Sequence, residues 1–184
     1  GLRLGSLVKV RTAELSPIIQ EHYPALSAAA TTFAGVQIRN LATLGGNVCN
    51  GSPAGDMIPS LIAFGAECRI VGPVGERWLP LEEIFVGPGR TSLQPGDVLA
   101  EFHLPPRGPN SGSLYIKHSP RSAMDIAAVG IAASVSLNPA EGLCSEVRIA
   151  MGAVAATPIR ALDAERVLIG RRVDESLIDE EAKA

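Results

Sequence analysis

Glycine and proline interrupt this sequence so often that few long regular elements fit between them. The chain of 184 residues contains 19 glycines and 14 prolines, and both exceed average usage in globular proteins. Proline lacks a backbone N–H donor, and glycine adopts conformations that other residues avoid, so both mark turns and the ends of helices. The pattern predicts short helices and strands joined by tight turns and close backbone approaches.

The composition places the chain among globular proteins and excludes several classes of function. Hydrophobic residues make up 46% of the chain and charged residues 19%, which supplies a core and excludes a disordered tail. The formal net charge of -3, without a basic block, argues against a nucleic-acid partner. No apolar stretch approaches the ~20 residues needed to cross a bilayer, so we expect no membrane span.

The cysteines indicate a reducing environment. The chain has three of them, Cys49, Cys68 and Cys144, widely separated and outside any Cys-x-x-Cys pair. This spacing argues against a disulfide framework, a zinc site or an iron–sulfur cluster within the chain. A cytoplasmic location is therefore expected.

Apolar periodicity and helix-end signals predict the main elements. A helix is expected from residue 26 to 33, entered after Pro24 and closed by Gly35 in a left-handed cap. A second helix is expected to start at Asp56 as its N-cap, with Pro59 in the first turn. One or two short strands are expected within 2–12, and further strands at 67–71, 77–79, 97–104, 113–118, 126–137 and 147–154. The final helices are expected at 160–169 and 173–184.

The segment Thr43-Leu44-Gly45-Gly46-Asn47 carries the strongest binding signal. Two adjacent glycines can adopt positive φ and expose consecutive backbone N–H groups, which can surround an anion such as a pyrophosphate. Thr43 and Asn47 add side-chain donors. The segment is neither a Walker loop nor a GxGxxG motif. A Gly-Gly pair by itself is weak evidence for such a site and favours a plain turn; the nearby Ser52-Pro53 and Asp56 strengthen the binding interpretation.

Several motifs occur together along the chain. They are Ile38-Arg39-Asn40-x-Ala42-Thr43-x-Gly45-Gly46-Asn47, Ser52-Pro53-x-x-Asp56-x-x-Pro59, Gly75-x-Arg77-x-x-Pro80-Leu81, Tyr115-x-Lys117-x-x-x-Arg121-x-x-x-Asp125-Ile126-Ala127 and Gly152-x-Val154-x-x-Thr157-Pro158-x-Arg160. Together they resemble the FAD-binding subunit of molybdenum hydroxylases. This family includes the FAD domain of xanthine dehydrogenase and the medium subunit of aerobic carbon monoxide dehydrogenase.

The resemblance implies an α+β fold in two parts. Residues 1–107 would form an FAD-binding subdomain with a mixed or antiparallel sheet and helices. Residues 108–184 would form a small C-terminal α+β domain with a three-stranded antiparallel sheet, cut short at its end. The family's first FAD motif, a Gly-Gly-Thr-type loop, has no counterpart here, so we expect only part of the flavin cradle in these residues.

The resemblance also implies roles for individual residues. Thr43, Gly45, Gly46 and Asn47 would hold the FAD pyrophosphate and the neighbouring ribityl chain, and Ala42 belongs to the same cofactor-binding segment. The remaining implied contacts are Phe33 on adenine, Asp56 on the ribityl hydroxyls, Leu99 against the isoalloxazine ring and Lys117 near the polar edge of that ring. Each has an alternative: core packing for Phe33 and Leu99, helix capping for Asp56 and a solvated strand lysine for Lys117. No catalytic or metal-binding residue is predicted.

The function implied is electron transfer by a flavoprotein subunit. In this family a molybdopterin-binding large subunit oxidises the substrate, and [2Fe-2S] clusters on a small subunit pass electrons to FAD and on to an external acceptor. Such complexes are commonly dimers of heterotrimers. Two alternatives remain, a flavin-free scaffold of the same fold and a flavin oxidase of the vanillyl-alcohol-oxidase kind. The sequence identifies neither the substrate nor the electron acceptor.

Overall fold

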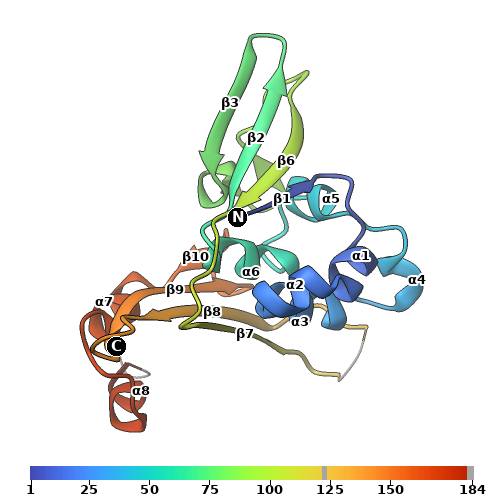
Figure 1. Ribbon diagram of the computed structural model, residues 1–184. Coiled ribbons are helices and arrows are strands. Elements are labelled where there is room, and N and C mark those ends of the chain that lie inside the picture. Colours follow the sequence, from blue (N-terminus) through green and yellow to red (C-terminus); the bar gives the residue numbers. More distant parts are fainter. Residues whose placement is uncertain (122–123, 182–184) are drawn as a thin grey trace.

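The structure of the protein is a computed structural model that describes residues 1–121 and 124–181 (Figure 1). The first part of the chain contains β1 (Leu2–Gly5), α1 (Val10–Leu15), α2 (Pro17–His22), α3 (Pro24–Thr32), α4 (Val36–Arg39), α5 (Leu44–Cys49), α6 (Met57–Ala63), β2 (Glu67–Gly72), β3 (Gly75–Pro80), the 3-10 helix η1 (Leu81–Ile84), β4 (Phe85–Gly87), β5 (Arg90–Thr91) and β6 (Val98–Leu104). The second part contains β7 (Ser111–His118), β8 (Val129–Leu137), β9 (Cys144–Gly152), β10 (Ile159–Arg160), α7 (Leu162–Leu168) and α8 (Glu175–Glu181).

Two antiparallel sheets organise the chain. The first has the order β1-β6-β2-β3, and its β2–β3 hairpin projects from the body, with Val74 at its tip 96% exposed (Figure 1). The second has the order β10-β9-β8-β7. The three strands predicted for it are confirmed, and the two-residue strand β10 adds a fourth. The predicted α+β class with antiparallel sheets is therefore confirmed.

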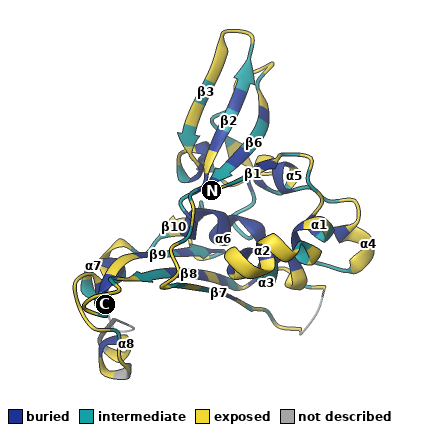
Figure 2. Cartoon of the chain, viewed as in Figure 1, coloured by how far each residue is buried: buried dark blue, intermediate teal, exposed yellow. Residues whose placement is uncertain are grey.

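Helices α3 and α6 pack on one face of the second sheet, and α6 is dark blue along its length in Figure 2. Both helices contribute buried residues to the main core. Every residue of α6 is buried, and α3 buries its apolar face against β7 and α6. The same core includes Tyr115, Ala132 and Ala150 of the second sheet. The two sheets thus share one core, and the division at residue 107 falls between β6 and β7, where it stays a prediction.

A smaller apolar cluster lies on the other side of the second sheet. Cys144 and Val147 of β9 pack there against Leu168 of α7 and Leu177 of α8. The end of the predicted helix 173–184 lies outside the described residues. None of the helices in the described part of the chain has the length and apolar content required to cross a bilayer.

Three local predictions were wrong. Of the one or two short strands expected within 2–12, β1 is present, but residues 10–15 form α1 instead of a second strand, and Val10 and Ala13 share its buried face. Gly35 is extended at φ -89, and the left-handed residue after α3 is Ala34 at φ 39. No helix was predicted between Gly35 and Asp56, yet α4 and α5 lie there.

Candidate functional site

The Gly-Gly segment forms the first turn of a helix instead of an open loop. Thr43 is the N-cap of α5, and its Oγ1 accepts a hydrogen bond from the Gly46 N–H at 2.9 Å. The Gly45 N–H donates to the Ser6 carbonyl at 2.8 Å, and the Asn47 N–H donates to the Thr43 carbonyl at 3.0 Å. Neither glycine has positive φ. The expected positive-φ nest is therefore wrong in conformation, because the chain itself supplies acceptors for these amides.

The two glycines meet different surroundings. A Cβ on Gly45 would lie 2.6 Å from the Ser6 Cβ and 2.9 Å from the Ser6 oxygen, so only glycine fits this close approach of two backbones. Gly46 is exposed, and a Cβ there would approach only the Thr43 hydroxyl, at 2.9 Å. Gly45 therefore serves packing, whereas Gly46 is exposed and its N–H is bonded to the Thr43 hydroxyl.

Asp56 precedes α6 but does not cap it with its side chain. The Met57 N–H donates instead to the Asn47 Oδ1 at 3.2 Å, so Asn47 supplies this cap from α5. The Asp56 Oδ2 accepts from the Lys117 Nζ at 2.9 Å, and the Oδ1 accepts from the Tyr115 hydroxyl at 3.3 Å. The predicted capping role of Asp56 is wrong, because charged and hydroxyl donors from β7 compete more strongly than a backbone amide.

The ion pair between Asp56 and Lys117 is almost fully buried. The side chains are 11% and 6% exposed, respectively. Burial raises the pKa of the Asp56 carboxyl, and the hydrogen bonds and charge supplied by Lys117, with the hydroxyl of Tyr115, oppose that rise. Burial, together with the Asp56 charge, raises the pKa of the Tyr115 hydroxyl, which therefore remains a donor at neutral pH.

A cavity of about 480 Å³ brings several predicted residues together at the C-terminal end of α3. Its volume lies within the range of small-molecule sites. Three site residues predicted from the sequence line it: Phe33, Asn47 and Asp56. The rest of the wall comes from Ala34 after α3, from the loop after α5 and from the segment that follows β7. The two latter parts comprise Asn50, Ser52, Ala54, Gly55, Arg121, Met124, Asp125 and Ile126.

Other predicted residues lie outside the wall of this cavity. Lys117 reaches it only through Asp56. Leu99 is 4% exposed in the core of the first sheet, as the packing alternative proposed. Ala42 packs against the core, and its carbonyl accepts from the Val10 N–H at 2.9 Å. Lys117, Leu99 and Ala42 remain predicted cofactor contacts. The same holds for Thr43, Gly45 and Gly46 at the start of α5.

Backbone strain is concentrated beside the cavity. Among the described residues, three other than glycine have positive φ: Ala34 at 39°, Met124 at 53° and Ala153 at 66°. Ala34 and Met124 line the cavity, and the Ala153 N–H donates to the carbonyl of Pro53, near the cavity wall, at 2.8 Å. Such strained residues cluster at ligand sites, where the surrounding structure maintains them.

Sequence reasoning missed Tyr115, Ala34 and Met124. Tyr115 was noted in a motif without a role, because its contact with Asp56 joins residues 59 positions apart. Local sequence gives no signal for positive φ at alanine or methionine. For Tyr115 the alternation of β7 was an available signal, since it places Tyr115 and Lys117 on the same face of the strand.

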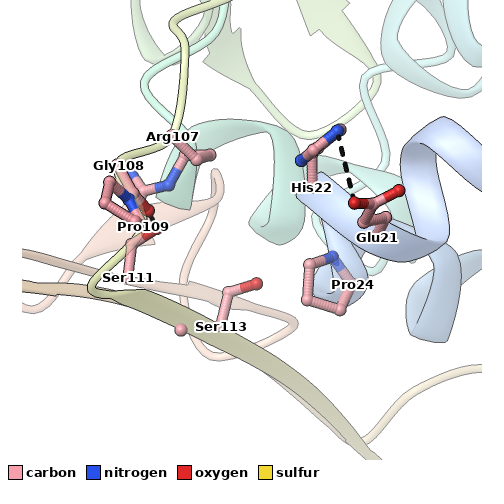
Figure 3. Close-up of a pocket in the computed structure, with 9 residues that line it drawn as sticks. Glu21, His22, Pro24, Arg107, Gly108, Pro109, Ser111 and Ser113 are labelled. Atoms are coloured by element: carbon pink, nitrogen blue, oxygen red, sulfur yellow. Dashed lines mark hydrogen bonds and ion pairs between the residues drawn. The ribbon is translucent and has the colours of Figure 1, made fainter.

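A second cavity, of about 450 Å³, lies at the opposite end of α3 (Figure 3). It is lined by Glu21 and His22 of α2, Arg107 and the serines of β7. It contains none of the predicted cofactor residues. Within residues 1–121 and 124–181, no group of three or more His, Cys, Asp or Glu residues is placed to hold a metal ion.

Two family models match the chain. The FAD binding domain in molybdopterin dehydrogenase matches residues 1–107, and the CO dehydrogenase flavoprotein C-terminal domain matches residues 114–184. A putative xanthine dehydrogenase FAD-binding subunit of Escherichia coli K12 is 43% identical over 166 residues, which are 90% of this chain and 56% of that protein. The carbon monoxide dehydrogenase medium chain of Hydrogenophaga pseudoflava is 32% identical over 169 residues, 92% of this chain and 58% of that one.

Solved structures agree with these matches. A structure of carbon monoxide dehydrogenase from Hydrogenophaga pseudoflava superposes with a TM-score of 0.92 at 31% identity, covering 98% of this chain and 62% of that chain. Quinoline 2-oxidoreductase from Pseudomonas putida gives a TM-score of 0.87 at 27% identity, covering 99% and 62%. The chain therefore spans a little over half the length of each of these relatives.

Proposed function

The chain belongs to the family of FAD-binding domains in molybdopterin dehydrogenases, and we propose that it holds FAD as part of the flavoprotein subunit of a molybdenum hydroxylase. The observation that carries this proposal is the cavity at the end of α3. There an aromatic ring, a carboxamide and a carboxylate from three separate segments, Phe33, Asn47 and Asp56, face one space. The family resemblance assigned Phe33 to adenine, Asn47 to the pyrophosphate and the neighbouring ribityl chain, and Asp56 to the ribityl hydroxyls.

The chemistry of the cavity wall fits parts of a dinucleotide. Phe33 is half-buried and can stack on a heteroaromatic ring while its backbone stays fixed, because Arg39 donates to the Phe33 carbonyl at 3.0 Å. The Asp56 carboxylate, neutralised by Lys117, can accept hydrogen bonds from hydroxyl groups. Asn47, Asn50 and Ser52 add neutral donors and acceptors. An aromatic contact at one position and hydroxyl acceptors at another suit adenine and a polyol.

We assign the residues of this chain to binding and orientation. When bound, FAD supplies the redox chemistry, and the protein supplies position and electrostatic environment. Asp56 would fix the ribityl chain and Phe33 the adenine. The Thr43 hydroxyl, which accepts from the Gly46 N–H, would donate its own proton to a phosphate at the start of α5. Leu99 and Lys117 remain proposed contacts of the isoalloxazine ring. Ala42 and Gly45 shape the backbone at the start of α5. None of these residues is assigned a proton transfer.

The role proposed for the whole subunit is transfer of electrons from iron–sulfur clusters to an external acceptor. Its partners would be a molybdopterin-binding large subunit and a [2Fe-2S] small subunit, arranged as a dimer of heterotrimers in the cytoplasm. The names of the relatives support this assignment, since they include medium chains of a carbon monoxide dehydrogenase and a glyceraldehyde dehydrogenase. The match to an FAD binding domain over residues 1–107 weighs against the flavin-free scaffold and the oxidase alternative.

The test uses the full-length subunit that contains these residues. We expect purified protein to carry flavin, measured by its visible absorption after release from the protein. Asp56→Ala should lower the flavin content strongly, since it removes the acceptor in the cavity. Glu165→Gln is the matched control, because Glu165 is also a buried, ion-paired carboxylate, but lies in α7. A colourless wild-type subunit that fails to take up added FAD would refute the proposal.

A further inference from the structure

Tyr115 lies at the centre of a small polar cluster on the inner face of β7. Its side chain is buried, with the residue 5% exposed, yet its hydroxyl has a defined partner in the Oδ1 of Asp56 at 3.3 Å. Lys117, two residues along the same face, holds the other oxygen, Oδ2, at 2.9 Å. The two donors from one strand therefore fix both oxygens of the carboxylate.

The carboxylate held in this way belongs to the wall of the cavity, whereas the two donors do not. Lys117 also donates to the Thr32 carbonyl at 3.4 Å, which ties the cluster to the last turn of α3. The charged groups nearest on the cavity side are Arg121 and Asp125, and they pair with each other at 3.1 Å. Tyr115 and Lys117 are therefore the groups that set the orientation and the charge of Asp56.

Gly130 of β8 provides the space in which the Tyr115 hydroxyl lies. Tyr115 is paired with Ala132 across the sheet, and its ring extends diagonally over Gly130. A Cβ on Gly130 would lie 2.8 Å from the Tyr115 hydroxyl oxygen and 3.5 Å from two ring carbons. A larger residue at this position must displace the hydroxyl, and with it the hydrogen bond to Asp56.

We propose that Tyr115 is a positioning residue for cofactor binding: in the space left by Gly130, and together with Lys117, it fixes the ionised Asp56 carboxylate as an acceptor for the hydroxyl-bearing chain of FAD. The inference rests on the proposed function, and it adds two residues, Tyr115 and Gly130, that need not contact the cofactor. It follows that changes at either position act on FAD through Asp56.

The test compares two variants with two matched controls in the full-length subunit. Tyr115→Phe removes the hydroxyl, and Gly130→Ala displaces it while the ring is retained. Tyr23→Phe is the control for the first, because Tyr23 is buried and its hydroxyl donates to the Pro105 carbonyl at 2.8 Å, away from the cavity. Gly112→Ala is the control for the second, because nothing lies within 4 Å of a Cβ at Gly112 of β7.

Two readouts separate positioning from simple stability. The first is the pKa of Asp56, measured from its carboxyl 13C shift without cofactor. It should rise in Tyr115→Phe and Gly130→Ala, because a hydrogen bond that favours the charged form is lost. The second is the dissociation constant of FAD against pH, from flavin fluorescence. It should increase about tenfold in both variants, the size expected when one hydrogen bond that orients the acceptor is lost, and its pH dependence should move in the same direction as the Asp56 pKa.

The outcomes distinguish this inference from the proposed function. Wild-type protein that binds no FAD would overturn both. Wild-type binding with an unchanged Asp56 pKa and unchanged FAD affinity in Tyr115→Phe and Gly130→Ala would overturn the inference alone. Equal losses in Tyr23→Phe would also overturn it, since they would reduce the effect to stability. If Tyr115→Phe fails to fold, Gly130→Ala decides between these outcomes.

Discussion

Replacement of Lys117 by methionine should make the stability of the protein depend on pH in a defined direction. The substitution keeps most of the side-chain volume but removes the cation 2.9 Å from Asp56, in a pair whose side chains are 6% and 11% exposed. Breaking a buried pair by removing one partner costs about 3–5 kcal/mol when the other charge remains. Asp56 can avoid the full cost by taking up a proton, so the loss is limited by its pKa.

The sign follows from proton binding. In the variant, burial acts on Asp56 without the opposing cation, so the pKa of the folded state lies further above the unfolded value of about 3.9. A folded state that binds more protons than the unfolded chain loses stability as the pH rises. Lys117→Met should therefore match wild type closely near pH 4 and lose about 1.4 kcal/mol for each unit by which the Asp56 pKa rises.

The assay is urea unfolding of the full-length subunit at several pH values between 4 and 8, without cofactor. The double variant Lys117→Met with Asp56→Asn should recover much of the lost stability at pH 7, because the buried charge is gone. A loss in Lys117→Met that is the same at every pH, or that persists unchanged in the double variant, would refute the assignment of a buried, cation-dependent carboxylate.

The other predictions concern packing and the cavity loop. Gly45→Ala should lower the free energy of unfolding by about 1–3 kcal/mol through overpacking, because its Cβ would lie 2.6 Å from the Ser6 Cβ; urea unfolding measures this, and an unchanged midpoint would contradict it. Arg39→Met should cost about 1–3 kcal/mol, since it removes the charged hydrogen bond to Glu14 at 2.8 Å while Arg11 still pairs with Glu14; thermal unfolding at neutral pH measures it, and a variant as stable as wild type would contradict it. Phe33→Ala should weaken FAD binding by about tenfold at small cost in stability, because Phe33 is half-buried in the cavity wall; a fluorescence titration that gives the wild-type affinity would contradict it.

The sequence predicted the strands well because they carry local signals. Alternating apolar residues bounded by Gly-Pro or Asn-Pro turns located β2 with β3 and the β8–β9 hairpin to within a few residues. The helix after Pro24 also followed from its spacing. Helices α1, α2, α4 and α5 were missed because they contain at most six residues, which is too short for a helical period to stand out.

The site was predicted as a set of residues more successfully than as a geometry. Phe33, Asn47 and Asp56 do line one cavity, but local rules misassigned how Asp56 and the glycines are used. The position of Asp56 before a helix predicts an N-cap, whereas its carboxylate pairs with Lys117, 61 positions later in the chain. Tandem glycines suggest positive φ, whereas Gly45 is required by the nearby backbone of Ser6. Both errors arise because tertiary partners are not encoded in the neighbouring sequence.

Occupancy of the cavity can be measured directly with a fluorine probe. Phe33 is replaced site-specifically by 4-fluorophenylalanine in the full-length subunit, and a second sample carries the label at Phe85, which is buried outside the cavity. During titration with FAD, the account predicts that the 19F signal at position 33 shifts and saturates at one FAD per chain, while the signal at position 85 stays constant. Saturable FAD binding that leaves the signal at position 33 unmoved would contradict the account.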